Sequence, residues 1–228
     1  MTGKMPPLVT VRQTQEKDLP ALIDLQRRTY PTIQPWAADK VLRQIEVFPQ
    51  GQLVAELDGQ LVGAASALVV LWDDWVDVHT WKEITARGTF DTHDNRGRTL
   101  YGAEVLVDSA MQGRGVGHHL YNARKQLCRR LNLKRIIACG RLPGYGAVAH
   151  SMGVEMYCKK VLWGDLTDPV LSFQLREGFR YCGVVPGYIP EDVDSCGCAS
   201  LIAWLNPAHD PDRPTLISNL AVTDESLL

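Results

Sequence analysis

A glycine-rich turn, Gln112–Gly117, is the feature of this chain that most constrains its fold. It follows an apolar run typical of a strand, Leu100–Val107, and opens a run with helical spacing that ends near Leu131. The first N–H groups of a helix have no acceptor within the helix, and the helix dipole favours negative charge beside them. Gly115 and Gly117 lack the Cβ atoms that would keep a phosphate away from the backbone. The turn therefore predicts a pyrophosphate site.

Three kinds of phosphate-binding turn are candidates. A P-loop needs Lys and then Ser or Thr after its last glycine, whereas His118 and His119 stand there. A dinucleotide turn, G-x-G-x-x-G, needs a third glycine one position beyond Gly117 and an acidic residue at the end of the next strand. That strand, Arg135–Cys139, ends in Cys-Gly, which disfavours an NAD(P)-dependent oxidoreductase. The third kind, Q/R-x-x-G-x-G/A, is matched in full.

In that third pattern, Gln112, Gly115 and Gly117 occupy the fixed places, and the turn resembles that of the GNAT acetyltransferase superfamily. There it cradles the pyrophosphate of coenzyme A. The resemblance implies that backbone amides of Gly113–Gly117 bind this group, with Arg114 or His118 adding charge. The cofactor-binding residues implied in this way are Leu106, Val107, Gln112, Gly113, Arg114, Gly115, Val116, Gly117, His118 and Phe173. A glycine turn that binds nothing is the alternative that the context has to decide.

Composition narrows the class of protein. The chain has 228 residues, of which 45% are hydrophobic and 22% charged, as expected for one globular domain. A formal charge of −2 gives no basic excess for nucleic acid. No apolar stretch predicts a signal peptide or a membrane span, which requires about 20 residues. Six scattered cysteines favour a reduced, cytoplasmic protein.

Periodicity and turn signals give the order of elements. Asp58-Gly59 between two apolar arms predicts a type I′ hairpin, and Asp18 with Pro20 predicts a helix start. Gly178 is expected to end a helix. The expected strands cover residues 8–12, 53–57, 61–70, 100–107, 135–139, 179–185 and 199–205; the expected helices begin at Asp18 and cover 38–47, 116–131, 154–161 and 169–177.

This order resembles that of GNAT proteins over residues 8–207. The resemblance implies an α/β (α+β) fold: a mixed, mostly antiparallel central sheet, helices on both faces, and two long insertions, residues 72–98 and 141–165. Residues 1–7 and 208–228 are expected to be tails. Several stretches, including His79–Trp81, Thr99–Gly102 and Leu171–Phe179, are similar to the acetyltransferase domain found ahead of carbon–nitrogen hydrolases. No hydrolase sequence follows Pro207, so a single-domain acetyltransferase is expected.

Glu104 is the predicted general base. An amine acceptor arrives mostly as ammonium and must lose a proton before it attacks the thioester, and general base catalysis typically contributes about 10²–10⁴-fold. Charged side chains are seldom placed in the middle of a core strand without a reason. The alternative for Glu104 is a solvated position on a sheet edge. No Cys or Ser is placed beside a His in a way that suggests a nucleophile, so direct transfer from acetyl-CoA to the amine, without an acyl-enzyme, is predicted.

The chain departs from the family pattern at the proton donor. Gln174 stands where many GNAT members have a tyrosine, and Thr167 stands where many have an asparagine that touches pantetheine. An amide is no general acid, so the donor is open; Tyr145, Tyr157 and Tyr188 are the candidates. This departure also keeps a second hypothesis open, a non-catalytic module that binds acyl-CoA.

The two insertions carry the remaining polar and aromatic clusters. His79 and His93 accompany four aspartates without a compact metal-ligand spacing, so no metal site is expected. A solvated arm or a lip over the acceptor pocket is expected there, and the tryptophans of the arm leave a clamp, a pocket wall or a homodimer contact open. Cys196 and Cys198 are expected to pack in a strand. The acceptor is a small molecule or a peptide amine, which the sequence does not identify.

Overall fold

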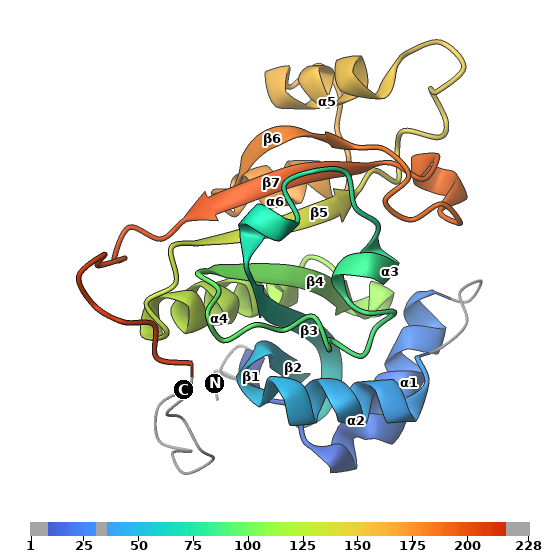
Figure 1. Ribbon diagram of the computed structural model, residues 1–228. Helices are drawn as coiled ribbons and strands as arrows, with labels where there is room; N and C mark the ends of the chain where they lie inside the picture. Colours follow the sequence, from blue (N-terminus) through green and yellow to red (C-terminus); the bar gives the residue numbers. More distant parts are fainter. Residues whose placement is uncertain (1–8, 31–35, 218–228) are drawn as a thin grey trace, which may run out of the picture.

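A seven-stranded sheet forms the centre of the computed structural model, which describes residues 9–30 and 36–217 (Figure 1). The strand order is β1-β2-β3-β4-β5-β7-β6, and every neighbouring pair is antiparallel except β4 with β5. The strands are β1 Val9–Gln13, β2 Gln52–Leu57, β3 Gln60–Val70, β4 Thr99–Val107, β5 Arg135–Arg141, β6 Arg180–Val185 and β7 Ala199–Leu205.

Helices cover both faces of this sheet. In Figure 1, α1, α2 and α3 lie in front, α4 and α6 lie behind, and α5 lies beyond β6. The expected mixed, mostly antiparallel sheet with helices on both faces is confirmed. The helices are α1 Leu19–Thr29, α2 Ala38–Val47, α3 Trp81–Ile84, α4 Val116–Arg130, α5 Val154–Trp163 and α6 Leu171–Arg176; short 3₁₀ turns are η1 Glu16–Asp18, η2 Pro49–Gly51, η3 Trp72–Asp74, η4 Ser109–Met111 and η5 Val193–Ser195.

Several local predictions hold because the residues themselves set the backbone. Asp58 and Gly59 have φ angles of 52° and 80°, as a type I′ turn requires, and they join β2 to β3. Gly178 has a φ of 82° directly after α6. The strand pair β2–β3 follows from the Asp58-Gly59 turn and from the apolar residues on either side of it.

Asp18 has a different role from the predicted helix cap. It precedes α1, but its carboxylate makes no hydrogen bond to the first amides of that helix. Instead it accepts from the Arg12 guanidinium at 2.7 and 2.8 Å and from the Gln15 backbone N–H at 2.8 Å. Arg12 also bonds Glu56, so this carboxylate fastens the chain before α1 to β1 and β2.

The first insertion, residues 72–98, is not the solvated arm that was one of the two expected forms; the other, a lip over the acceptor pocket, stays a prediction. The insertion packs over the face of the sheet that also carries α1 and α2, and it contributes its own buried side chains to the core. Ile84 and Phe90 are fully buried there beside Tyr101 of β4. His93 stacks on Phe48 and accepts a hydrogen bond from the Val69 amide. The apolar residues of this insertion do not recur with the period of a helix or a strand, so the sequence pattern did not reveal its packing.

Part of the expected C-terminal tail is also packed. Asn132, at the end of α4, donates to the carbonyls of Asp210 and Arg213 at 2.8 and 2.9 Å, and Ile217 is buried. Residues 208–217 therefore lie against the core. The other proposed tail residues, 1–7 and 218–228, lie outside the described residues, as does Leu8, with which the first strand was expected to begin.

Candidate functional site

The parallel strands β4 and β5 part half-way along their length. They pair from Thr99 with Arg135 to Gly102 with Ala138, and beyond that point β4 has no partner on the β5 side. Ala103, the residue after the last pair, is the extra residue of a β-bulge against β3. The edge of β4 from Ala103 to Val107 therefore has no strand partner on the β5 side. The Ala103 and Glu104 carbonyls accept from the Trp81 and Arg124 side chains at 3.1 and 2.6 Å, so an extended ligand would pair with the other backbone groups of this edge.

The glycine-rich turn lies between η4 and α4, as predicted. Gly113 and Gly115 have φ angles of 78° and 79°, which favour glycine, and α4 begins at Val116. Within the described chain, the backbone N–H groups of Gly113 and Gly115–Gly117 have no backbone acceptor. Free amides at the start of a helix of 15 residues are a general site for an anion.

Gly117 is also required for packing. A Cβ atom there would lie 3.0 Å from Cζ of Phe173 on α6. Phe173 in turn packs edge-on against Tyr121 of α4, with ring centroids 5.1 Å apart. The two helices thus approach each other closely beside the turn, which places Phe173 next to the predicted cofactor residues.

The two predicted charge donors of this turn differ in their surroundings. Arg114 is exposed. His118 contacts the Glu177 carboxylate at 3.0 Å and Asn122 at 2.8 Å, so its imidazole is already held between α4 and the end of α6. A phosphate contact by His118 would have to compete with Glu177.

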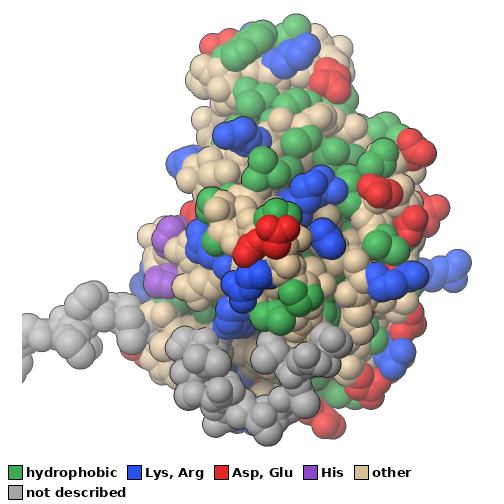
Figure 2. Space-filling model, turned by 60° about the vertical axis from the view of Figure 1, so that its left-hand side comes forward, with side chains coloured by type: hydrophobic (Ala, Val, Ile, Leu, Met, Phe, Trp, Pro, Cys, Tyr) green, Lys and Arg blue, Asp and Glu red, His purple; other side chains and the backbone are tan. Residues whose placement is uncertain are grey.

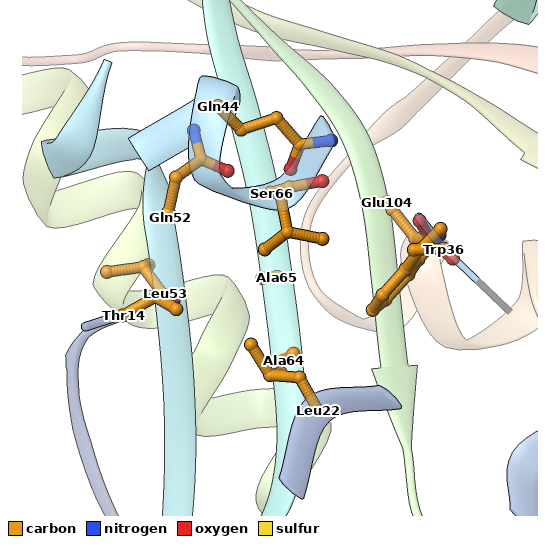
Figure 3. A pocket seen from close by; sticks show the side chains of 11 residues that line it. Thr14, Leu22, Trp36, Gln44, Gln52, Leu53, Ala64, Ala65, Ser66 and Glu104 are labelled. Atoms are coloured by element: carbon orange, nitrogen blue, oxygen red, sulfur yellow. The ribbon is translucent and has the colours of Figure 1, made fainter. Parts of the chain in front are cut away.

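Glu104 is half-buried on β4, two residues past the last β4–β5 pair, and is not a solvated edge residue. It lines a cavity between the sheet and helices α1 and α2, where Figure 3 shows it beside the Trp36 indole. Burial raises the pKa of Glu104 to about 8, while a hydrogen bond from Trp36 and the charge of Arg141 act in the opposite direction. The other lining residues are Thr14, Leu22, Val41, Gln44, Gln52, Leu53, Ala64, Ala65 and Ser66.

Arg141, at the end of β5, carries a positive charge that acts to lower the pKa of Glu104. Its Nε donates to Oδ2 of the buried Asp192 at 2.6 Å, and its guanidinium carbon lies 5.9 Å from the centre of the Tyr30 ring. Burial acts to raise the pKa of Asp192, but the hydrogen bonds from Arg141 and Ser195 together with the charge of Arg141 outweigh it, so the pKa of this carboxyl lies below its usual value. Sequence reasoning did not single out Arg141, Asp192 or Tyr30, because they come from three distant segments.

One cysteine of the described chain lies beside a histidine, which the sequence did not reveal. Sγ of Cys139 on β5 is 4.0 Å from Nε2 of the buried His79, and Tyr101 and Tyr188 complete this cluster. Burial raises the pKa of the Cys139 thiol to about 12, so at neutral pH it remains a thiol, which is a poor nucleophile.

The remaining clusters show no metal centre. No group of three or more His, Cys, Asp or Glu side chains suited to a metal ion occurs within residues 9–30 and 36–217. Cys196 is exposed in a turn with a φ of 48°, not in a strand as expected. Thr167 is exposed as well.

The surface matches a chain without a strong net charge. The face drawn in Figure 2 intersperses Lys and Arg with acidic and hydrophobic side chains. No helix within the described ranges is both long and apolar enough to cross a membrane.

Comparisons with known proteins identify relatives and similar folds. Two relatives come from Bacillus subtilis (strain 168). "Probable hydrolase YhcX" is 40% identical over 205 residues, covering 90% of this chain and 40% of its own length. "Uncharacterized N-acetyltransferase YkwB" is 34% identical over 202 residues, covering 87% of this chain and 89% of its own. The chain therefore spans only two fifths of the first relative.

Solved structures share the fold. The loading GNATL domain of CurA from Lyngbya majuscula has a TM-score of 0.77 at 22% identity, over 87% of this chain and 98% of that one. The GphF GNAT-like decarboxylase in complex with isobutyryl-CoA has a TM-score of 0.74 at 26% identity, over 86% and 99%. The profile of the acetyltransferase (GNAT) family matches residues 19–149. On this match and on the similarity to YkwB, the chain belongs to the GNAT acetyltransferase family.

Proposed function

We propose that this protein transfers an acetyl group from acetyl-CoA to a primary amine by direct attack of the amine on the thioester. The observation that carries the proposal is the alignment of three features along β4. They are the backbone amides of Gly113 and Gly115–Gly117, which have no backbone acceptor within the described chain, the edge of β4 from Ala103 to Val107 without a strand partner, and the Glu104 carboxyl beside that edge.

Coenzyme A fits the first two features. The helix amides suit its pyrophosphate, with Gln112 at the turn and Val116 at the helix start. Pantetheine carries amide groups, which pair with a free strand edge as an added strand would. The backbone near Leu106 and Val107 then holds pantetheine, and N–H groups freed by the parting of the strands face the thioester carbonyl. A fixed N–H donor at a developing oxyanion is worth about 10²–10³ in rate.

Glu104 supplies the proton acceptor. Its pKa of about 8 lies near neutral pH, where a general base combines useful basicity with a usable ionised fraction. The amine loses a proton to Glu104, its nitrogen attacks the carbonyl carbon, and the C–S bond of the thioester breaks. Tyr30, Trp36 and Arg141 surround this position and form the side from which the amine arrives.

The identity of the donated acyl group and that of the accepting amine are the two specificities to determine. The GphF structure holds isobutyryl-CoA, so larger acyl groups belong in the donor series. On the acceptor side, Arg141 favours a group with a negative charge near the amine, whereas the cavity beneath α1 and α2 offers mainly apolar walls. Amino acids, peptides and hydrophobic amines are therefore the acceptors to compare first.

The test is thiol release by the full chain with acetyl-CoA or isobutyryl-CoA and a broad panel of amines, including amino acids, peptides, polyamines and arylalkylamines. Thiol release that depends on one amine, with a matching increase in the mass of that amine, supports the proposal. Saturable CoA binding without turnover on any amine identifies the non-catalytic acyl-CoA-binding module instead. That module is the second function that Gln174 keeps open, since an amide is no general acid.

A further inference from the structure

A buried polar cluster lies behind the fork between β4 and β5, on the α4 and α6 face. Tyr121, Arg124 and Gln174 form it, with exposed fractions of 5%, 3% and 4%. Gln174 Nε2 donates to the Tyr121 hydroxyl at 3.2 Å, which joins α6 to α4. The Arg124 guanidinium carbon lies 5.7 Å from the centre of the Tyr121 ring.

Small residues at the fork make room for this cluster. A Cβ atom on Gly102, in the last β4–β5 pair, would lie 2.8 Å from Nη1 of Arg124. A Cβ atom on Gly140, beyond the point of parting, would lie 2.3 Å from Oε1 of Gln174. The cluster therefore closes the fork from one face of the sheet, and Glu104 lies on the other face.

The cluster is incompletely paired. Nη2 of Arg124 donates to the carbonyls of Ser66 and Glu104 at 2.9 and 2.6 Å, and no carboxylate pairs with this guanidinium within the described chain. Its Nε and Oε1 of Gln174 are buried without a partner. Each buried polar atom left in this way costs about 1–3 kcal/mol. An apolar core would avoid that cost, so these side chains are better explained by a role at the fork.

We propose that Tyr121 is the general acid that protonates the departing thiolate of coenzyme A, with Gln174 and Arg124 as positioning residues. This inference rests on the proposed acetyl transfer. Gln174 stands where the family pattern has a tyrosine, and its amide holds the hydroxyl of Tyr121 there instead. Because Gln174 donates to the hydroxyl oxygen, the phenolic hydrogen remains available for transfer.

The acetyl transfer requires only the two substrates, Tyr121, Glu104 and solvent. The amine nitrogen forms the new C–N bond, and the C–S electron pair passes to sulfur as that bond breaks. The sulfur takes the Tyr121 proton, and the phenolate beside Arg124 regains one from solvent. Glu104 takes the proton that the amine loses. The products are the acetylated amine and free CoA thiol.

The three tyrosines predicted from the sequence have other partners. The Tyr157 hydroxyl donates to the buried Asp168 at 2.8 Å, and Tyr145 packs against the Tyr157 ring. The Tyr188 hydroxyl bonds that of Tyr101 at 2.7 Å in the His79 cluster. Tyr121 is the tyrosine whose hydroxyl bonds the side chain at the family's donor position.

The test compares Tyr121→Phe with the matched control Tyr157→Phe in the full chain, using the best amine found for the wild type. We expect Tyr121→Phe to lower kcat with acetyl-CoA at least tenfold, because general acid catalysis typically contributes about 10²-fold or more. The dissociation constant of CoA should be unchanged. Each variant is also assayed with S-phenyl thioacetate. Thiophenol is a far better leaving group, so kcat/KM of Tyr121→Phe should then match the wild type within about twofold, since no acid is needed.

A purely structural role of Tyr121 predicts an equal loss with both donors, and that result, or a Tyr121→Phe variant with wild-type kcat on acetyl-CoA, overturns the inference. Gln174→Leu provides a second variant. It should lower kcat with acetyl-CoA and recover with S-phenyl thioacetate in the same way. If the wild type binds CoA yet releases no thiol with any amine, the proposed function fails as well; failure confined to the Tyr121 comparison leaves acetyl transfer standing.

Discussion

Arg141 joins the end of β5 to Asp192 in the loop before β7, with a hydrogen bond of 2.6 Å from Nε to Oδ2. This pair fixes the guanidinium on the side of the sheet where Glu104 lies, and its charge acts to lower the pKa of Glu104. The pKa of the Glu104 carboxyl is thus subject to two opposing effects, burial and the charge of Arg141.

The first prediction concerns this opposition. Removing the cation in Arg141→Ala should raise the pKa of Glu104, because only the Trp36 hydrogen bond is then left to oppose the effect of burial. The acidic limb of kcat/KM against pH should move to higher pH. Arg43→Ala, which removes an exposed arginine paired with Asp91, is the control and should leave the limb in place. An unchanged limb in Arg141→Ala would show that this charge does not reach the base.

The second prediction concerns Glu104 itself. Glu104→Gln keeps the shape and removes the base, so kcat should fall by about 10²–10⁴-fold. In the wild type, kcat/KM should rise with pH until Glu104 is ionised, which places the limb near pH 8. That limb should be absent from the residual activity of Glu104→Gln. A variant that retains full activity with the same pH profile would exclude Glu104 as the base.

A third prediction links the same carboxyl to stability. Its pKa is about 8 in the folded chain against 4.5 ordinarily, so the folded state binds the proton more tightly. This contribution to the free energy of unfolding is complete below pH 4.5 and is lost as pH rises through 8. Glu104→Gln removes this titration, so the Tm of the variant relative to that of the wild type should increase between pH 5 and pH 9. Equal pH dependence of Tm in both proteins would contradict the burial of this group.

The fourth prediction tests the glycine turn. Gly115→Ala introduces a Cβ at a φ of 79°, where a non-glycine residue costs of order 1–3 kcal/mol, and places it beside the free amides. Gly164→Ala has the same strain at a φ of 82°, at the end of α5, with nothing within 4 Å of the new atom. Both should lose similar Tm, but only Gly115→Ala should weaken CoA binding, by tenfold or more. Equal affinities in the two variants would place the pyrophosphate elsewhere.

Local signals explain what the sequence could predict. Asp58-Gly59 determines a turn by its own backbone preferences, and the glycines after β4 mark a helix start in the same way. The period of the apolar residues gave α2 its observed bounds, Ala38–Val47. Such signals act over a few residues, and the order of the elements follows from them.

Long-range pairings explain the rest. Tyr121 and Gln174 are far apart in the chain, as are His79 and Cys139, and no sequence period links them. The bulge at Ala103 changes which β4 residues share a face of the sheet. A strand pattern with a regular period of two residues does not predict this change. Within the first insertion, burial of Ile84 depends on the sheet beneath it. The sequence singled out Glu104 as the general base, which stays a prediction, but it did not reveal Trp36 and Arg141, which act on the pKa of this carboxyl.

Calorimetric titration of the full chain with acetyl-CoA tests the central claim most directly. We expect saturable one-site binding that free CoA competes for, that NAD(P) does not, and that Gly115→Ala weakens while Gly164→Ala does not. A folded sample that gives no heat and no saturation with acetyl-CoA would contradict the assignment of the α4 amides to an acyl-CoA pyrophosphate, and with it the proposed reaction.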